Sequence, residues 1–264
     1  MKNIIVIPAR YHSTRLPGKP MVQISGKSML QRVWTIAKAA QNIDEIFIAT
    51  DDQRIQHHAQ IFGAQVIMTD PSYPTGTDRV HAAVSQLSQK PEIIINLQGD
   101  AALTPPWIIQ DLIDGMIQNS SAAMATLATQ LTWQKYDELV KSKITSKSSG
   151  TTVTFDKDGY ALYFSKSIIP FVRNKDEKAL LSPVFKHIGI YGYRFDTLAK
   201  FVSLAQTPLE KVESLEQLRM LENGIKIKVV KADLKGRTMW SVDCPEDVKK
   251  VEEIIAREGE LATF

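Results

Sequence analysis

The sequence has few of the features that mark secreted, membrane-spanning or nucleic-acid-binding proteins. It has one cysteine, Cys244, which excludes an internal disulfide framework and favours a reducing, cytoplasmic location. No apolar stretch approaches the roughly 18 residues of a membrane span, and the apolar start before Arg10 is too short for a signal peptide. The net charge is only +3 and there is no long basic run, so nucleic acid is not expected as a partner.

What the sequence does contain is a regular alternation of short apolar runs and amphipathic segments in its first half. Strands are predicted at 4–7, 46–50, 65–68 and 92–97. Helices are predicted at about 28–41, 55–62 and 79–87. This order is typical of an α/β fold with a mostly parallel sheet and right-handed crossovers. We therefore expect residues 1–130 to form a nucleotide-binding half.

The second half of the sequence differs from the first in composition and in residue pattern. Residues 141–152 are rich in Ser, Lys and Thr and are predicted to be a mobile connection or an exposed edge. Alternating residues on either side of an Asp-Lys-Asp-Gly turn predict a hairpin over 152–164. A strand is expected at 187–194, helices at 196–204 and 208–222, a strand at 225–230, and a terminal helix opened by Pro245.

The loop at 8–20 follows the first predicted strand and carries three cations, Arg10, Arg15 and Lys19. Prolines stiffen this loop, and small residues such as Ser13 let its backbone fold closely around a ligand. Ligands of open α/β sheets bind outside the carboxyl ends of the strands. Arg grips phosphate oxygens bidentately and Lys adds a point charge. The loop matches neither common glycine-rich phosphate motif. We interpret it as a polyphosphate site rather than a solvated basic loop.

Three other segments could contribute chemistry, and local reasoning leaves each ambiguous. Asp100 follows a buried strand, where it could hold Mg²⁺ on a nucleotide or simply form a turn. Asp243 could be a second such carboxylate, or a helix N-cap before Pro245. Residues 75–79 could contact a base or phosphate, or cap a helix. His187 is the one histidine in a motif-like setting, and no His/Cys grouping has zinc spacing.

Seven segments, taken together and in order, resemble the 3-deoxy-manno-octulosonate (Kdo) cytidylyltransferase family, the CMP-Kdo synthetases of lipopolysaccharide biosynthesis. They are the opening loop, Thr75–Arg79, Leu97–Asp100, Gly159–Ser165, His187–Arg194, Pro208–Arg219 and Val242–Asp247. The resemblance spans residues 3–250. It implies a single nucleotidyltransferase domain over 1–264 with a Rossmann-like α/β fold, usually found as a homodimer. Residues 131–250 would form the sugar-binding and dimerisation half, and 251–264 a C-terminal extension.

The resemblance also implies the reaction and its residues. The anomeric hydroxyl of an acidic octulosonate sugar would attack the α-phosphorus of CTP, giving a CMP-sugar and pyrophosphate. Catalysis would involve Lys19, Asp100 and Asp243, with the two aspartates holding Mg²⁺ as the cofactor. The residues implied to contact the nucleotide are Arg10, Ser13, Arg15, Lys19, Thr75 and Arg79. The residues implied to line the sugar pocket are Gln98, Lys166, His187, Tyr191, Glu213 and Gln217.

Departures from the family pattern gather on the sugar side. Ala101 and Ala102 stand where the family has Glu-Pro, and Lys166 stands where it has Arg. The stretch at 141–152 replaces an Asn-Pro-x-x-Val-Lys-Val segment. Because Lys cannot make a bidentate carboxylate contact, our hypothesis is that the acceptor is a modified octulosonate, for example one bearing an 8-amino group.

Two alternative interpretations remain. One is a CMP-sialic-acid-type synthetase, which shares the fold and a similar use of the opening loop. The segments at 187–194 and 208–219 argue against it. The other is a catalytically silent nucleotide-binding relative. Retention of both Asp100 and Asp243 disfavours that interpretation, because a silent protein does not need two metal ligands.

Overall fold

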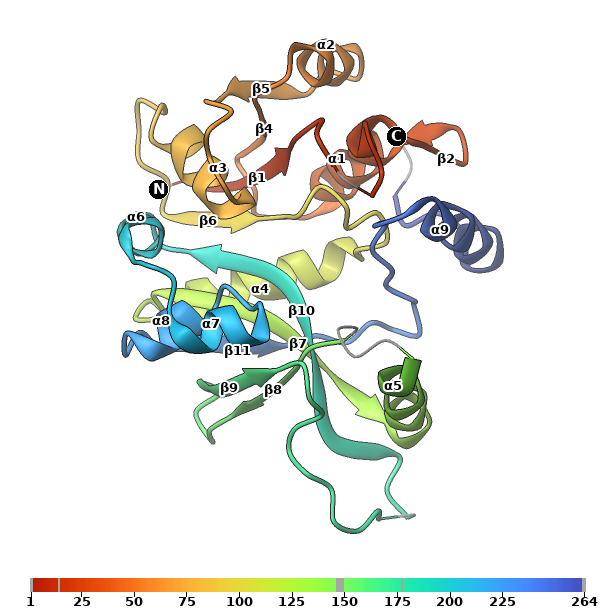
Figure 1. Ribbon diagram of the computed structural model, residues 1–264. Helices are drawn as coiled ribbons and strands as arrows, with labels where there is room; N and C mark the ends of the chain where they lie inside the picture. The colour runs from red at the N-terminus through yellow and green to blue at the C-terminus, as the bar shows by residue number, and fades with distance from the viewer. Residues whose placement is uncertain (1, 14, 146–149, 177, 263–264) are drawn as a thin grey trace.

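A computed structural model describes residues 2–13, 15–145, 150–176 and 178–262 (Figure 1). Its main sheet contains β1 (Asn3–Ala9), β4 (Glu45–Thr50), β5 (Gln65–Met68), β6 (Ile93–Asn96), β7 (Met124–Thr132), β8 (Thr152–Phe155), β9 (Ala161–Ser165), β10 (Leu181–Tyr193) and β11 (Ile227–Lys231). The strands lie in the order β11-β7-β10-β6-β1-β4-β5, while β8 pairs with β10 and β9 pairs with β8. A short separate hairpin joins β2 (Gln23–Ile24) to β3 (Lys27–Ser28).

The sheet is mainly parallel, as predicted from the sequence. β1 pairs in parallel with β4 and β6, and β4 pairs in parallel with β5. β10 runs antiparallel to both β6 and β7. Along β1, Ile5 and Ile7 pack into one buried cluster, while Ile4 and Val6 pack into another on the opposite face. Burial on both faces explains why this strand is an unbroken apolar run.

Helices cover both faces of the sheet. The helices are α1 (Met29–Ala39), α2 (Gln53–Ile61), α3 (Gly76–Val84), α4 (Pro106–Gln118), α5 (Trp133–Thr145), α6 (Phe195–Ser203), α7 (Pro208–Glu213), α8 (Leu218–Glu222) and α9 (Pro245–Glu258), with a short 3₁₀ helix η1 (Lys19–Met21). α1, α2 and α4 bury their apolar sides on one face, and α3, α6 and α8 bury theirs on the other. Within the described ranges, no helix is long and apolar enough to cross a membrane.

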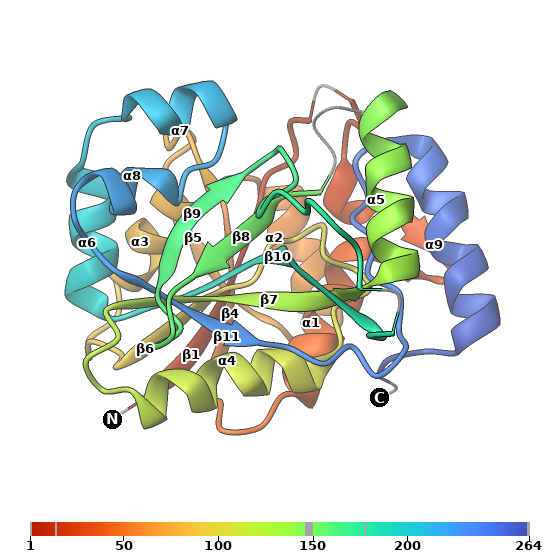
Figure 2. The ribbon, with the colours of Figure 1, turned by 90° about the horizontal axis from the view of Figure 1, so that it is seen from below.

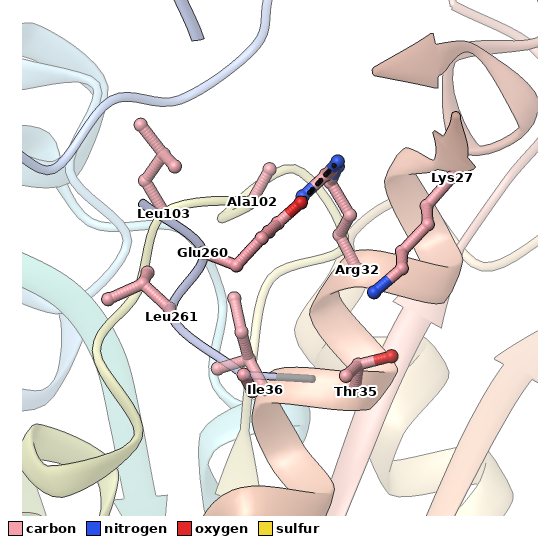
Figure 3. Close-up of a pocket in the computed structure, with 9 residues that line it drawn as sticks. Lys27, Arg32, Thr35, Ile36, Ala102, Leu103, Glu260 and Leu261 are labelled. Carbon is pink, nitrogen blue, oxygen red and sulfur yellow. Dashed lines mark hydrogen bonds and ion pairs between the residues drawn. The ribbon is translucent and has the colours of Figure 1, made fainter. Parts of the chain in front are cut away.

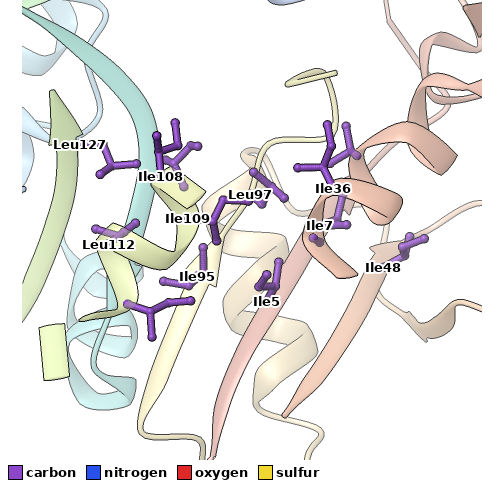
Figure 4. Close-up of a cluster of buried hydrophobic side chains, with 14 of the residues drawn as sticks. Ile5, Ile7, Ile36, Ile48, Ile95, Leu97, Ile108, Ile109, Leu112 and Leu127 are labelled. Carbon is purple, nitrogen blue, oxygen red and sulfur yellow. The ribbon is translucent and has the colours of Figure 1, made fainter. Parts of the chain in front are cut away.

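The core between the sheet and helices α1 and α4 is built from branched aliphatic side chains (Figure 4). Ile5 and Ile95 from the sheet belong to one cluster with Ile36 of α1 and Ile109 of α4, and all four are at most 4% exposed. Burying a side chain of this size stabilises the fold by about 1.5–3 kcal/mol. This cluster fixes the strand ends whose loops form the site described below.

Most of the predicted elements are confirmed, with boundaries shifted by a few residues. The hairpin over 152–164 corresponds to β8 and β9, and the late strand to β11. Pro245 opens α9 as predicted. Figures 1 and 2 both place α9 on the opposite side of the molecule from α6 and α8.

Three predictions in the second half are wrong in detail. The helix expected at 208–222 is two helices, because Ser214 adopts a left-handed conformation with φ 52° and ends α7. The strand expected at 187–194 is only the last part of β10. Of the connection expected at 141–152, residues 141–145 continue α5 and Thr152 begins β8, while 146–149 lie outside the described residues.

Candidate active site

An open cavity of about 630 Å³ lies beyond the carboxyl ends of β1 and β6. β4 and β6 flank β1 on opposite sides, so the chain order along the sheet reverses here. Open α/β sheets bind ligands at such a switch point. The lining residues are Pro8, Ala9, Arg10, His12, Ser13, Arg15, Lys19, Pro20, Met29, Tyr73, Thr75, Gly76, Arg79, Gln98, Gly99, Asp100 and Asp243.

Close approach of three loops forms the floor of the cavity. A Cβ atom at Gly99 would lie 2.8 Å from the carbonyl oxygen of Pro8, and one at Gly76 would lie 3.3 Å from the Pro8 ring. Glycine at position 99 therefore lets the loop after β6 touch the end of β1. Gly18 has a φ of 68°, and its N–H donates to the carbonyl of Tyr11 at 3.1 Å. This turn brings η1 back over the cavity.

Lys19 lies between two carboxylates at the edge of the cavity. Its Nζ atom donates to Asp100 at 2.8 Å and to Asp243 at 3.1 Å, and its side chain is 15% exposed. Arg15 also donates to Asp243, at 3.0 Å. The interpretation of Asp243 as the helix cap is wrong, because Cys244 is the N-cap of α9. Asp243 precedes the cap, and its side chain faces the cationic loop instead.

The other candidates for nucleotide contact also border the cavity: Arg10, Ser13, Thr75 and Arg79. Thr75 caps α3, in a capping box with Asp78, so the capped-helix interpretation of this segment is confirmed. Arg79 is only 3% exposed, and its guanidinium donates to Thr69 at 2.6 Å. Arg79 is therefore firmly anchored, with its position fixed at the cavity wall.

The sugar-pocket candidates are divided between two places. Gln98 is among the described residues that line the cavity. The other five belong to a neighbouring hydrogen-bonded cluster on β9, β10 and the α7–α8 segment. There Glu213 accepts hydrogen bonds from the hydroxyl of Ser165 and the backbone N–H of Lys166, both at 2.7 Å. Both carboxylate oxygens of Glu213 are thus engaged, which fixes the backbone at Lys166.

Tyr191 and His187 are held in uncharged forms within this cluster. The Tyr191 hydroxyl donates to Gln217 Oε1 at 3.0 Å, and burial raises the pKa of Tyr191 well above 10. His187 Nε2 lies 2.9 Å from the hydroxyl of Thr126. Burial, and then the charge of Lys166, lower the pKa of His187 to about 3. Gln217 Nε2 is buried and has no partner among the described residues, so one amide donor remains available here.

A buried chain of hydrogen bonds links the cavity to this cluster, and sequence reasoning missed it. Gln98 donates to Asn96 at 3.0 Å, Asn96 donates to Thr77 at 3.2 Å, and Thr77 donates to Glu216 at 2.9 Å. Burial raises the pKa of Glu216. A polar Asn at the end of an isoleucine run was the available signal, because a buried amide requires partners.

Lysines surround the same cluster, and two of them were also missed. The pKa of Lys143 is lowered by burial and then by the charges of Lys166 and Lys186. Lys143 Nζ donates to the carbonyl of Gly150 at 2.6 Å. Closely spaced ammonium groups repel each other, and a bound carboxylate would relieve that repulsion.

The donors present fit a magnesium ion shared with a nucleotide. In the part of the chain that the structure describes, no group of three or more His, Cys, Asp or Glu side chains could enclose a metal ion. Asp100 and Asp243 nevertheless converge on one ammonium nitrogen, which shows that their oxygens can share a cation. Mg²⁺ is commonly held by one or two carboxylates together with substrate phosphates and water.

A mainly parallel α/β sheet, a cationic loop and two converging carboxylates at the switch point fit a nucleotide-dependent transferase of phosphorus-containing groups. The sequence profile of the cytidylyltransferase family matches residues 4–227. The chain belongs to this family and, within it, to the 3-deoxy-manno-octulosonate cytidylyltransferases.

Several relatives match over nearly their whole length. The 3-deoxy-manno-octulosonate cytidylyltransferase of Maricaulis maris is 50% identical over 261 residues, covering 99% of this chain and 100% of the relative. The enzyme of that name from Thermodesulfovibrio yellowstonii is 45% identical, with coverage of 97% and 98%. An 8-amino-3,8-dideoxy-manno-octulosonate cytidylyltransferase of a Shewanella species is 41% identical, with coverage of 97% and 99%.

Solved structures show the same fold. The structure of CMP:2-keto-3-deoxy-manno-octonic acid synthetase complexed with CTP superposes with a TM-score of 0.85 at 37% identity, covering 98% of this chain and 100% of that chain. A cytidylyltransferase from Leptospira borgpetersenii superposes with a TM-score of 0.62 at 16% identity, covering 97% and 88%.

Proposed function

We propose that this protein transfers the cytidylyl group of CTP to an acidic octulosonate sugar, releasing pyrophosphate, for lipopolysaccharide biosynthesis. The observation that carries the proposal is Lys19 held between Asp100 and Asp243 at the switch-point cavity. The Kdo and CTP named for the similar proteins support the substrate choice. In the reaction, the anomeric oxygen forms a bond to the α-phosphorus of CTP. The bond between the α-phosphorus and the oxygen that bridges it to the β-phosphorus breaks, and pyrophosphate leaves. The proton of the anomeric hydroxyl is lost to the surroundings.

The cationic loop would bind the triphosphate. Arg10, Arg15 and Lys19 border the cavity from one continuous segment, and Ser13 lies between them. Transfer of this kind requires mainly in-line positioning and neutralisation of charge on the phosphates and on the leaving pyrophosphate. Thr75 and Arg79, which also line the cavity, would contact the cytidine. Their fixed positions suit recognition because little side-chain freedom is lost on binding.

Asp100 and Asp243 would hold Mg²⁺ on the triphosphate. The ion would screen the negative charge that opposes attack at phosphorus. Lys19 would then pair with a phosphate oxygen instead of the two carboxylates. Arg10 and Arg15 line the same cavity and would bind phosphate oxygens together with it. Residues 1–130 would thus supply most of the nucleotide site, while Asp243 comes from the far end of the chain.

The sugar would occupy the space between Gln98 and the cluster of Lys166, His187, Tyr191, Glu213 and Gln217. His187 and Tyr191 are uncharged and would hydrogen-bond sugar hydroxyls rather than exchange protons with them. Gln217 Nε2, which has no hydrogen-bond partner among the described residues, would supply one donor. The lysines around Lys166 favour a carboxylate ligand.

The same electrostatics bear on whether the acceptor is Kdo or its 8-amino form. An added ammonium group would meet the charges of Lys166 and Lys186, which add to burial in lowering the pKa of Lys143. We therefore favour unmodified Kdo over the amino sugar that the departures at Lys166 suggested. The name of the 50% identical relative supports the same choice.

We also propose that the protein works as a cytoplasmic homodimer. Three exposed apolar residues lie in the half of the chain expected to dimerise: Leu181 begins β10, Leu180 directly precedes it, and Phe171 lies earlier in the segment between β9 and β10. Large exposed apolar side chains that lie close together commonly mark an interface. A second copy of this chain would cover them, and nucleoside triphosphates are plentiful in the cytoplasm.

The test is pyrophosphate release from CTP and Mg²⁺ with Kdo and 8-amino-Kdo assayed side by side. We expect turnover with Kdo at least as good as with the amino sugar. Asp100→Ala should abolish pyrophosphate release. Asp233→Ala, at an exposed turn, is the matched control and should retain it. No turnover with either sugar would overturn the proposal in favour of a silent nucleotide-binding relative. Strong preference for the amino sugar would overturn the choice of acceptor alone.

A further inference from the structure

The segment that follows α9 returns to α1, the helix after the nucleotide loop. The carboxylate of Glu260 accepts hydrogen bonds from both terminal nitrogens of Arg32, at 2.7 and 3.1 Å (Figure 3). Arg32 is 4% exposed, and it also donates twice to the carbonyl of Ile24, at 2.8 and 2.6 Å. A bidentate guanidinium–carboxylate pair fixes both distance and orientation.

The same arginine joins a third element to these two. Ile24 belongs to the β2–β3 hairpin, and Arg32 donates to the next carbonyl, that of Ser25, at 3.2 Å. From α9, Glu252 accepts a hydrogen bond from the N–H of Ser25 at 2.8 Å. Apolar residues of the three elements share one cluster that includes Ile24, Met29, Val251, Ile254 and Ile255. The hairpin is thus clamped between α1 and α9.

Both ends of this clamp carry charged groups of the candidate active site. Lys19 lies on η1, which leads directly into the hairpin. Asp243 directly precedes α9, and Asp247 in the first turn of the helix accepts a hydrogen bond from its N–H at 2.8 Å. The backbone of Asp243 therefore moves with α9, and that of Lys19 moves with the hairpin.

We propose that Arg32 and Glu260 are positioning residues for the nucleotide site. By fixing α9 against the hairpin, they hold Asp243 where it can share a cation with Asp100. Neither side chain is among those that line the 630 Å³ cavity, so their effect passes through the two elements they join. This inference rests on the proposed function, because it takes Asp243 as a ligand of metal-bound CTP. It gives the C-terminal extension a role in the reaction rather than in stability alone.

The test compares Glu260→Gln with Glu253→Gln. Glu253 is an exposed residue of α9 that pairs with Lys250, so the control removes the same charge from the helix that precedes the Glu260 segment. Calorimetric titration with Mn²⁺ in the presence of CTP, without sugar and after subtraction of the heat of Mn²⁺ binding to CTP alone, measures the metal site. We expect Glu260→Gln to weaken Mn²⁺ binding about 3- to 10-fold, at or below the lower end of the range for outer-shell partners of a metal site. Its KM for CTP should rise similarly.

The KM for the sugar should stay within about 2-fold of wild type, because the side-chain hydrogen bonds between Arg32, Glu260 and Ile24 join α1, the C-terminal segment and the hairpin rather than β9 and β10. Glu260→Asp keeps the carboxylate and should recover part of the lost Mn²⁺ affinity. If Glu260→Gln lowers the melting temperature but binds Mn²⁺ as tightly as the control, the Arg32–Glu260 pair only stabilises the fold, and the inference fails. If the wild-type protein neither binds Mn²⁺ with CTP nor releases pyrophosphate, the proposed function itself fails.

Discussion

The ammonium nitrogen of Lys19 lies 3.1 Å from a carboxylate oxygen of Asp243, a residue 224 positions later in the sequence. The same nitrogen lies 2.8 Å from Asp100. Two carboxylates this close would repel each other, and the lysine between them offsets that repulsion. The cationic loop and the acidic pair are therefore one electrostatic unit rather than two.

Replacing Lys19 tests this unit directly. Lys19→Met keeps much of the side-chain bulk but removes the charge that neutralises phosphate in the transition state. We expect kcat/KM for CTP to fall about 10²- to 10³-fold, as for loss of one preorganised donor. Steady-state pyrophosphate release measures this. Lys200→Met, at an exposed position of α6, is the control and should retain activity. Comparable activity of the two variants would contradict the role of Lys19.

Asp243 should control the magnesium requirement more than sugar binding. Asp243→Asn removes one anionic ligand while keeping the size of the side chain. The Mg²⁺ concentration for half-maximal rate should rise at least about 10-fold, with little change in the KM for sugar. A Mg²⁺ titration of the initial rate measures this, with Asp233→Asn as control. An unchanged Mg²⁺ dependence would show that Asp243 is not a metal ligand.

His187 should make the protein less stable in acid. Its folded-state pKa is about 3, below the ordinary value of 6.5, so between these values only the unfolded chain takes up the proton. The stabilisation is complete above pH 6.5 and falls by about 1.4 kcal/mol per pH unit below it. Urea unfolding at pH 7.5, 5.5 and 4.5 should show this loss.

His187→Gln should reduce that slope, because the titrating group is gone. Thr126→Val removes the hydrogen-bond partner of His187 and leaves the histidine in place. This second variant should lose stability at every pH and keep most of the acid-dependent slope. Equal slopes in wild type and His187→Gln would contradict the assignment of the acid sensitivity to this residue.

The buried ion pair between Arg219 and Glu210 should matter greatly for stability when one partner is lost. Arg219 donates to both oxygens of Glu210, at 2.8 and 2.5 Å, and both side chains are at most 7% exposed. Arg219→Met would leave a buried carboxylate unpaired and should lower the free energy of unfolding by about 3–5 kcal/mol. The double variant Arg219→Met with Glu210→Gln should lose clearly less free energy of unfolding, as measured by urea unfolding. A double variant as unstable as the single one would refute this account.

Two glycines of β10 offer a matched test of packing. A Cβ at Gly192 would lie 2.4 Å from the sulfur of Met116, whereas one at Gly189 would meet nothing within 4 Å. Gly192→Ala should therefore destabilise the protein by about 1–3 kcal/mol through overpacking. Gly189→Ala should be neutral or stabilise it by up to about 1 kcal/mol. Thermal and urea unfolding would measure both, and equal effects would contradict the packing argument.

The first half of the fold could be predicted because its strands are buried on both faces and its helices are amphipathic. α4 had a usable signal that was overlooked, since Ile108, Ile109, Leu112 and Met116 recur at helical spacing. The first part of β10 alternates buried and exposed residues over a short distance only, which is a weak pattern. The end of α7 at Ser214 depends on a left-handed backbone conformation, which the presence of a serine does not predict.

The site was predictable where residues sit at strand ends and not where partners meet only through tertiary structure. The loop after β1 and Asp100 follow buried strands, so their common edge follows from parallel topology. By contrast, the Thr77–Glu216 hydrogen bond joins residues 139 positions apart, and the Arg32–Glu260 pair joins residues 228 positions apart. Local sequence carries no information on such pairings.

The late position of Asp243 has a consequence for synthesis of the protein. In a growing chain the cationic loop leaves the ribosome well before α9 and before Asp243, which lies 224 positions after Lys19. The strand β11, which pairs with β7, also arrives late. A chain released early by a premature stop codon would therefore keep the first carboxylate and lack the second. We expect such fragments to use CTP less efficiently than the full chain, because one of the two carboxylates proposed to hold Mg²⁺ is missing.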